Sequence, residues 1–227
     1  MRHILLGAVA FCALAAPAFA GNQLMNGSFE DGFNGWTVGG VSDDGFPPVV
    51  ISYYNNDGYP TGAYGESIPA DDATTPDTDP VGTHAAYFVA DQAHPQTLSQ
   101  FVSIVQGKTY TFGFDVYVPF NGAQNANDAS FSAVVGGDNF ATFTASSLTP
   151  GTWIHYESTG LANGTGTVSF DFDYNSFGVP AKDFVIDKVF FGTADVPEPA
   201  SWAMMVCGFG LVGGTLRSRR RAAISFG

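Results

Sequence analysis

Residues 110–118 read Tyr110-Thr111-Phe112-Gly113-Phe114-Asp115-Val116-Tyr117-Val118, and this stretch decides the fold class. Every second side chain, beginning with Tyr110, is apolar, while Thr, Gly, Asp and Tyr stand between them. Apolar residues that recur with a period of two lie on one face of a β-strand. The stretch therefore predicts a strand with one face in a core and the other in water.

The same pattern returns along the chain. Residues 168–174 place three aromatic side chains on one face and three polar ones on the other. Further strands are expected at residues 48–54, 85–91, 98–105, 129–135, 152–158 and 184–191. Residues 184–191 are apolar on both faces, which is typical of a central strand covered on both sides.

Turn-forming pairs such as Asn121-Gly122 and Pro150-Gly151 separate these runs, and no convincing helix occurs between residues 21 and 196. Eight or more strands joined by turns predict an all-β fold, an antiparallel jelly-roll β-sandwich. Residues 66–83, rich in Asp, Thr and Pro, predict a long surface loop.

Composition and charge exclude several classes of protein. Of the 227 residues, 45% are hydrophobic and 15% aromatic, which is too apolar for a disordered chain. The formal net charge is −13, and residues 21–196 hold 20 acidic residues against Lys108, Lys182 and Lys188, a net charge of −17. Such acidity argues against nucleic acid as a partner.

The first 20 residues differ from the rest. Arg2 precedes an apolar run over residues 4–16, and Ala18-Phe19-Ala20 follows as a small-x-small cleavage site. This order predicts a secretory signal peptide over residues 1–20, removed to leave Gly21 first. The two cysteines, Cys12 and Cys207, both lie outside residues 21–196, so the predicted exported domain contains no disulfide.

The last 31 residues, 197–227, form a third part. In order, they contain a Pro-Glu-Pro tripeptide, a tryptophan, an apolar run and a cluster of arginines: Pro197, Glu198, Pro199, Trp202, residues 203–216, Arg217, Arg219, Arg220 and Arg221. A tryptophan at one edge and arginines at the other suit the two interfaces of a bilayer. We therefore expect a transmembrane helix over residues 202–216.

This order of parts resembles the PEP-CTERM sorting signal of Gram-negative bacteria. The resemblance implies that an exosortase, a membrane protease-transpeptidase, processes the chain near the tripeptide after transient anchoring in the inner membrane. It also implies export to the cell envelope, the outer surface or the extracellular matrix, and a link to exopolysaccharide production.

A second resemblance covers the two ends of the predicted domain. Asn26-Gly27-Ser28-Phe29-Glu30, followed by Gly35-Trp36, looks like the opening of galactose-binding-like carbohydrate-binding modules, and Asp187 within residues 184–189 resembles their last strand. The resemblance implies a jelly roll with a structural Ca²⁺ at Glu30 and Asp187, since this ion prefers oxygen ligands. The alternative for Glu30 is a surface acid or a partner for Lys188.

Tyrosines cluster between residues 53 and 64. Tyr53, Tyr54, Tyr59 and Tyr64 stand among Asn, Asp and Gly. Sugars stack on exposed aromatic rings, and nearby amides and carboxylates bind their hydroxyl groups. These four tyrosines are therefore candidate glycan contacts; Tyr117, Asn121, Asn125 and Asn127 have a similar composition. The alternative for each aromatic residue taken singly is a place in the core.

No catalytic motif is present. His84, His94 and His155 lie in neither a nucleophile motif nor a zinc motif. Asp171 and Asp173 share a predicted strand face, but such residues are roughly 7 Å apart, whereas retaining glycosidases need about 5 Å between the two carboxyl groups. We expect a solvated polar face there and a protein that is not an enzyme.

The sequence as a whole predicts an exported cell-surface or exopolysaccharide-matrix protein, and its favoured role is non-catalytic carbohydrate binding. The alternative is a structural biofilm or matrix protein whose acidic surface associates through cations. A glycan-acting enzyme is the third possibility, and it would need Asp171 or Asp173 for turnover.

Overall fold

The computed structural model describes residues 21–40, 46–73, 82–89, 96–123, 129–162, 166–174, 183–194 and 208–209. The chain forms two compact units, residues 20–194 and the two ends taken together. In the second unit only Gly208 and Phe209 are described, and both are helical. The expected signal peptide, Pro-Glu-Pro tripeptide, Trp202 and arginine cluster lie outside the described residues. Among the described residues no helix is long and apolar enough to cross a membrane.

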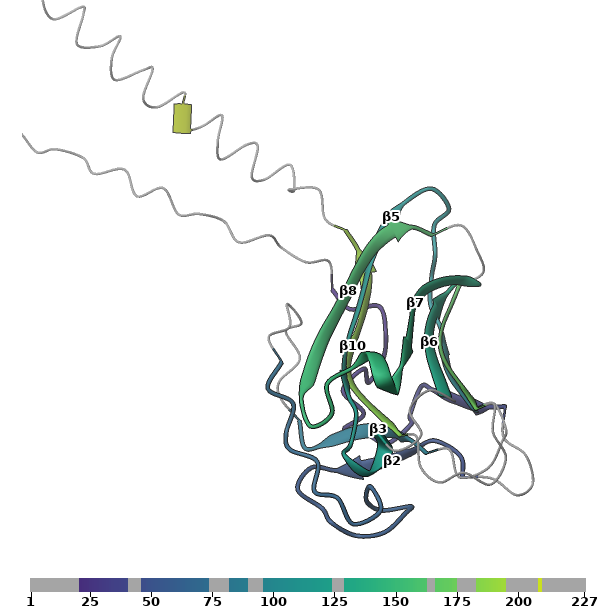
Figure 1. Cartoon of the computed structure of the whole chain (residues 1–227). Helices are drawn as coiled ribbons and strands as arrows, with labels where there is room; N and C mark the ends of the chain where they lie inside the picture. Colours follow the sequence, from purple (N-terminus) through teal and green to yellow (C-terminus); the bar gives the residue numbers. More distant parts are fainter. Residues whose placement is uncertain are drawn as a thin grey trace, which may run out of the picture. The chain divides into compact units, whose positions relative to one another are not determined.

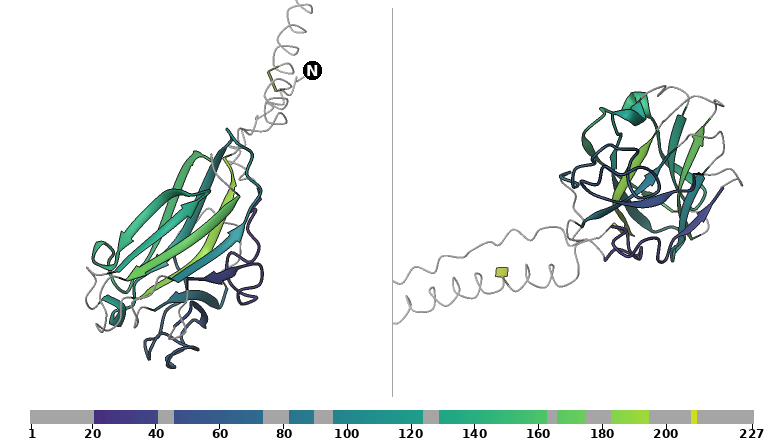
Figure 2. Two further views of the ribbon diagram at one scale, coloured as in Figure 1. Left: turned by 90° about the vertical axis from the view of Figure 1, so that its right-hand side faces the viewer. Right: turned by 90° about the horizontal axis from the view of Figure 1, so that it is seen from below.

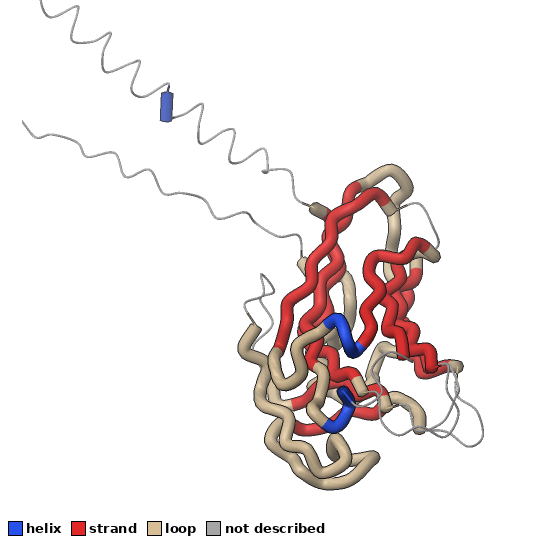
Figure 3. Tube along the Cα trace, in the orientation of Figure 1, coloured by secondary structure: helices blue, strands red, loops and turns tan. Residues whose placement is uncertain are grey.

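Residues 20–194 form the expected jelly-roll sandwich of two five-stranded antiparallel sheets (Figures 1 and 2). Sheet A has the order β1-β4-β9-β6-β7, and its strands are Thr37–Gly39, Gln96–Phe101, Thr167–Tyr174, Ala129–Val135 and Asp138–Thr144. Sheet B has the order β2-β3-β10-β5-β8, and its strands are Val49–Ser52, His84–Phe88, Phe184–Thr193, Thr109–Tyr117 and Trp153–Leu161. In the connections that the structure describes lie two 3₁₀ turns, η1 (Asn121–Ala123) and η3 (Ala145–Ser147) (Figure 3).

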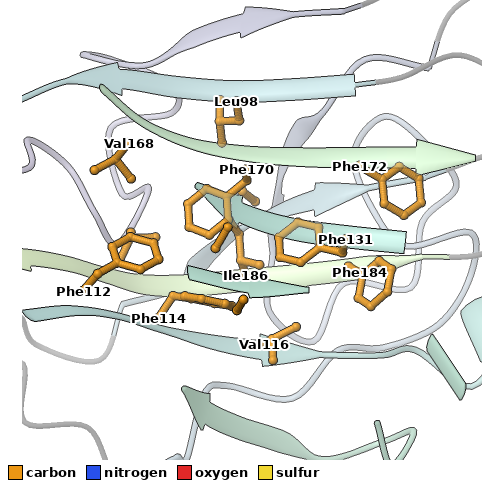
Figure 4. Packing of buried hydrophobic residues seen from close by; sticks show 14 of the residues in the cluster. Leu98, Phe112, Phe114, Val116, Phe131, Val168, Phe170, Phe172, Phe184 and Ile186 are labelled. Atoms are coloured by element: carbon orange, nitrogen blue, oxygen red, sulfur yellow. The ribbon is translucent and has the colours of Figure 1, made fainter. Parts of the chain in front are cut away.

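Aromatic side chains fill the space between the sheets (Figure 4). Phe131 of β6 lies against Phe184 of β10 with 5.1 Å between ring centroids, and Phe114 of β5 meets Phe170 of β9 edge-on at 5.2 Å. Each fully buried phenylalanine contributes roughly 1.5–3 kcal/mol through its transfer from water. The alternating aromatic residues of the sequence therefore make the contact between the two sheets.

Strand β5 corrects the expectation of a half-exposed strand. Every residue from Tyr110 to Tyr117 is buried, so both faces of the strand are covered. Its second face contributes to another apolar cluster, which includes Tyr117, Trp153 and side chains from residues 53–73, here called the covering loop. Strand β10 is buried along both faces as expected. Alternation in sequence identifies the face toward the core, but it does not show what packs on the other face.

Two edge strands were not expected. β1 has three residues, and β7 is largely exposed or half-buried, so neither carries a clear alternation of apolar residues. The segment Gly136-Gly137-Asp138-Asn139 reads as a turn, yet Asp138 and Asn139 already pair with β6. Where a strand of a hairpin begins depends on its pairing with the neighbouring strand as much as on its own residues.

The N-terminal segment lies along the last strand without being a strand itself. The Gln23 amide donates to the Phe191 carbonyl at 2.7 Å, and the Val189 amide donates to the Gly27 carbonyl at 3.0 Å. A Cβ atom on Gly27 would lie 2.2 Å from the Val189 carbonyl oxygen, so only glycine permits this approach. Trp36 is buried and its indole N–H donates to the Asn26 carbonyl.

Candidate functional site

Two of the four candidate tyrosines are exposed on the covering loop. Tyr54 is 68% exposed and Tyr64 is 39% exposed. Tyr59 is half-buried, and its hydroxyl donates to the Pro47 carbonyl at 2.9 Å. Tyr53 is buried against Trp153, and its hydroxyl donates to Asp187, so it does not belong to a ligand-contacting surface.

Ring packing fixes the position of Tyr64. Its ring stacks on that of Tyr59 with a centroid distance of 6.0 Å and an interplanar angle of 16°. Phe46 contacts both rings, at 5.0 Å from Tyr59 and 6.3 Å from Tyr64. A ring supported from behind loses little conformational freedom when a ligand covers its outer face. Tyr59 and Phe46 are therefore supports for Tyr64.

A neighbouring loop adds an aromatic ring that the sequence did not single out. Phe120 is 67% exposed and follows β5. Its ring lies over the backbone of Gly151, where a Cβ atom would be 2.3 Å from the ring. Phe120 belongs to no tyrosine cluster; the pairing of β5 with β8 and the hydrogen bond from the Gly151 amide to the Val118 carbonyl bring residues 120 and 151 together.

The carboxylate of Glu66 joins these two loops. It accepts hydrogen bonds from the Phe120 amide at 2.8 Å and from the Asn121 amide at 2.9 Å. The Asn121 side chain returns one to the Ala63 carbonyl at 3.1 Å. These three bonds place Tyr64 and Phe120 on adjacent, mutually attached loops. We call Tyr54, Tyr64 and Phe120 the aromatic surface.

The second candidate set, around Tyr117, forms no comparable surface. Tyr117 is buried and packs on Trp153 at 5.3 Å, which leaves no ring face for a ligand. Burial and the nearby carboxylate of Glu66 raise the pKa of Tyr117 above its ordinary value. Asn121 attaches one loop to another, and Asn125 and Asn127 lie outside the described residues.

Glu30, one of the two expected calcium ligands, binds the start of β3. Its carboxylate accepts hydrogen bonds from the Thr83 amide at 2.7 Å and the His84 amide at 2.8 Å, and its second oxygen lies 3.1 Å from His84 Nδ1. Partial burial acts to raise the pKa of Glu30, but the hydrogen bonds from His84 and Thr83 outweigh it and lower that pKa. Glu30 thus stabilises a turn.

Asp187, the other expected ligand, is fully buried in β10. One carboxylate oxygen accepts a hydrogen bond from the hydroxyl of Tyr53, and the other accepts one from the Lys188 amide at 2.7 Å. Burial raises the pKa of Asp187 well above its ordinary value. Glu30 and Asp187 therefore have separate protein partners, and no group of three acidic, histidine or cysteine side chains suited to a metal occurs among the described residues.

A buried ionic cluster lies beneath the covering loop. Lys188 Nζ is 3.2 Å from Asp71 Oδ2 and 3.6 Å from Asp115 Oδ2, and all three side chains are 3% exposed or less. His155 Nδ1 lies 2.6 Å from the other oxygen of Asp115. We call Asp71, Asp115, Asp187 and Lys188 the lysine cluster; it joins the covering loop to strands β5 and β10.

Burial and proximity perturb the cluster's titration. Burial and the neighbouring carboxyl of Asp115 raise the pKa of Asp71 to about 7. The hydrogen bond to Asp115 raises the pKa of His155, and it outweighs the opposing effect of burial. Three carboxyl groups face a single lysine, so a proton retained on Asp71 reduces the excess of buried negative charge.

Of the described residues considered for catalysis, His155 contacts this cluster through Asp115, whereas Asp171, Asp173 and His84 lie elsewhere. Asp171 and Asp173 lie on β9 in sheet A, opposite Ser132 and Ser130 of β6, while Asp173 is exposed. Burial raises the pKa of Asp171, although a hydrogen bond from Ser169 opposes that effect. His84 belongs to the Glu30 turn, and His94 lies outside the described residues.

Comparisons with known proteins identify similar structures and no family. No protein-family model and no curated protein match the sequence. TmCBM61 in complex with β-1,4-galactotriose is 19% identical, with a TM-score of 0.45 and coverage of 76% of this chain and 98% of that chain. The CBM22-1 xylan-binding domain of Xyn10C from Paenibacillus barcinonensis is 14% identical, with a TM-score of 0.41 and coverage of 79% and 99%.

The enzymatically active domain of tailspike protein 4 of bacteriophage CBA120 is also similar. It is 16% identical, with a TM-score of 0.45, and the match covers 76% of this chain and 21% of that chain. The similar structures thus include carbohydrate-binding modules and an enzymatic domain. Similarity at this level does not transfer a ligand or an activity, because unrelated functions occur on one fold.

Proposed function

We propose that this chain is an exported, non-catalytic carbohydrate-binding protein of the cell surface or exopolysaccharide matrix, and that the aromatic surface contacts the glycan. The observation that carries this proposal is that Tyr54, Tyr64 and Phe120 are exposed on two loops attached through Glu66. Single exposed apolar residues are common on protein surfaces. Three large rings on attached loops are a more specific arrangement.

The surroundings of these rings support a sugar as the ligand. Asn56, Asp57 and Ser67 are exposed on the same covering loop. A sugar ring presents C–H groups on one face and hydroxyls around its edge, so it suits an aromatic plane surrounded by polar groups. A long apolar ligand would leave these carboxylate and amide groups without partners.

Export and sorting belong to the same proposal. The signal-like residues 1–20 and the Pro-Glu-Pro, apolar and arginine elements of residues 197–227 support secretion followed by exosortase processing. Transient anchoring would involve the apolar run of residues 202–216. The jelly-roll unit would then act outside the cytoplasm.

The alternative function is cation-dependent association in a matrix. The net charge of −17 over residues 21–196 favours it, because divalent cations reduce repulsion between acidic surfaces. Self-association that needs calcium, without glycan binding, would support this alternative. Turnover of a glycan that is lost on replacing Asp171 or Asp173 would instead indicate an enzyme.

The test is a glycan array probed with the purified full-length chain, followed by calorimetry with the best ligand. Tyr54→Ala, Tyr64→Ala and Phe120→Ala should each weaken binding about two- to twelvefold, the equivalent of one aromatic contact of roughly 0.5–1.5 kcal/mol. The melting temperature should change little for Tyr54→Ala and Phe120→Ala, whose rings are 68% and 67% exposed, and more for Tyr64→Ala, whose ring packs on Tyr59 and Phe46.

The matched control is Phe101→Ala. Phe101 is 79% exposed at the end of β4, before β5 begins, whereas Phe120 follows the end of β5. This variant should bind glycan with unchanged affinity. The proposal is wrong if no glycan binds, or if all four variants lose affinity equally.

A further inference from the structure

Lys188 occupies an unusual place for a lysine. It lies in the irregularity of β10 between Asp187 and Phe190, with a backbone φ of +48°, and it is only 3% exposed. An L-residue rarely adopts this left-handed conformation, and a charged side chain is rarely buried without partners. Both features indicate that the interactions of its ammonium group compensate for the local strain.

The described residues place four oxygen atoms around that ammonium group. Two are carboxylate oxygens, from Asp71 at 3.2 Å and Asp115 at 3.6 Å. Two are main-chain carbonyl oxygens of the covering loop, from Asp71 and Ala73, both at 3.5 Å. Carboxylate and carbonyl oxygens are the ligands of a hard cation such as Ca²⁺, which binds them at about 2.3–2.6 Å.

The carboxylates expected to bind calcium are engaged elsewhere. Thr83 and His84 donate to the oxygens of Glu30, and Tyr53 and the Lys188 amide donate to those of Asp187. The acidic residues of this region require a positive charge to compensate theirs. The Lys188 side chain supplies that charge. Glu30 and Asp187 as arranged here do not fit a shared metal ion.

We propose that the ammonium group of Lys188 is a built-in cation at an oxygen site of the calcium type, and that it attaches the covering loop to sheet B without a metal ion. Asp71 and Ala73 belong to the covering loop, whereas Asp115 and Lys188 belong to β5 and β10. The ammonium group of Lys188 interacts with Asp71 on the loop and with Asp115 on β5. These interactions therefore also hold in place the loop that carries Tyr54 and Tyr64. This proposal does not depend on glycan binding.

The experiment compares Lys188→Gly with Lys188→Met in the purified full-length chain. Glycine tolerates the positive φ and leaves space at the oxygen site, whereas methionine leaves the space filled but removes the charge. In EDTA both variants should melt about 10 °C below the wild type, because each leaves buried carboxylates uncompensated. Calcium should restore most of the loss in Lys188→Gly and little of it in Lys188→Met.

Divalent cations screen the acidic surface, so the change in melting temperature caused by magnesium is subtracted from the change caused by calcium at the same concentration. After this correction, the wild-type chain should melt at the same temperature in EDTA and in calcium. Loss of wild-type stability on chelation would overturn the proposal. Failure of calcium to stabilise Lys188→Gly, whether that variant is unfolded or only weakened, would overturn it as well.

Discussion

Individual residues of this sandwich have roles that depend on their partners more than on their type. Tyr53 and Tyr54 are neighbours in sequence, yet Tyr53 is buried with its hydroxyl on Asp187, while Tyr54 is 68% exposed. Trp36, in a Gly-Trp pair of the kind expected near a domain start, packs on Phe29 and Phe170 in the core. The residue type shows only that each side chain is an aromatic ring. Whether that ring packs in the core or is available to a ligand depends on its burial.

Asp71 provides a prediction about pH at this scale. Its pKa is raised from an ordinary 3.8 to about 7, so between these values the folded chain binds a proton that the unfolded chain has released. The free energy of unfolding should therefore fall as pH rises from about 4 to about 7, by up to a few kcal/mol. Thermal melts over this range would measure it.

Other groups of the region act with or against this slope. The raised pKa of Asp187 has the same sign, and His155, whose pKa is also raised, extends the decline above its ordinary 6.5. Glu30, with a lowered pKa, acts oppositely, since its stabilisation is lost only as pH falls below its ordinary 4.5. Asp71→Asn should flatten the slope, whereas Asp138→Asn, at an exposed position of β7, should not. A melting temperature that rises from pH 5 to pH 7 would contradict this account.

At the scale of elements, the covering loop carries two of the three exposed rings of the candidate binding surface. Its Ile68 and Tyr53 belong to the apolar cluster that also contains Tyr117 of β5, and it reaches the next loop through Glu66. The apolar cluster and the lysine cluster attach it to sheet B at two separate places. Its exposed tyrosines are thus placed by contacts on the opposite side of the loop.

Glu66→Gln tests the attachment between the two loops. A glutamine side chain offers only one acceptor oxygen, so it can accept at most one of the two amides of Phe120 and Asn121 at full strength. We expect hydrogen exchange at these two amides to accelerate about tenfold, equivalent to roughly 1.4 kcal/mol. Mass-spectrometric exchange of the full-length chain measures this directly.

Glu157→Gln, at an exposed position of β8, is the control and should leave exchange at residues 120 and 121 unchanged. Glycan affinity should fall in Glu66→Gln if Tyr64 and Phe120 contact the same ligand. Unchanged exchange would show that Glu66 does not attach the loops.

At the scale of the whole molecule, charge and sequence separate the chain into parts with different expected fates. The jelly-roll unit holds nearly all of the acidic residues, whereas Arg2 and the arginines of residues 217–221 belong to the ends. If the chain is exported as proposed, the negative charge would favour solubility of the jelly-roll unit outside the cell, and the basic ends would favour the cytoplasmic side of a membrane.

Processing of the tail can be tested in the native host. Glu198→Ala removes the carboxylate from the Pro-Glu-Pro tripeptide, and we expect the variant to keep its C-terminal residues and to accumulate in the inner-membrane fraction. Intact mass spectrometry of the wild type should show loss of residues near the end of the chain. The matched control, Glu157→Gln, removes a carboxylate from the jelly-roll unit and should be processed normally. Retention of the C-terminal residues in the wild type, or their loss in Glu198→Ala as in the wild type, would contradict exosortase processing at this motif.

The sequence by itself determined the fold class and most of the strands. Alternation over residues 110–118 and 168–174 predicted β5 and β9, and the apolar residues 184–191 predicted the covered strand β10. The first two predictions succeed because one face of each strand borders the core, which gives a period of two, and the third because a strand covered on both faces is often apolar on both. The edge strands β1 and β7 escaped because they contribute few side chains to the core.

Only the tertiary structure decided what the candidate site contains. In the folded chain Tyr53 is buried and Phe120 is exposed beside the covering loop. The carboxylates of Glu30 and Asp187 accept hydrogen bonds from protein groups, and oxygen atoms surround Lys188 Nζ. Each outcome depends on contacts between distant segments, from the 53 residues that separate Glu30 and Thr83 to the 134 that separate Tyr53 and Asp187. A local pattern reports which face of a strand is apolar, whereas burial, charge compensation and exposure depend on segments that meet only after the two sheets have packed.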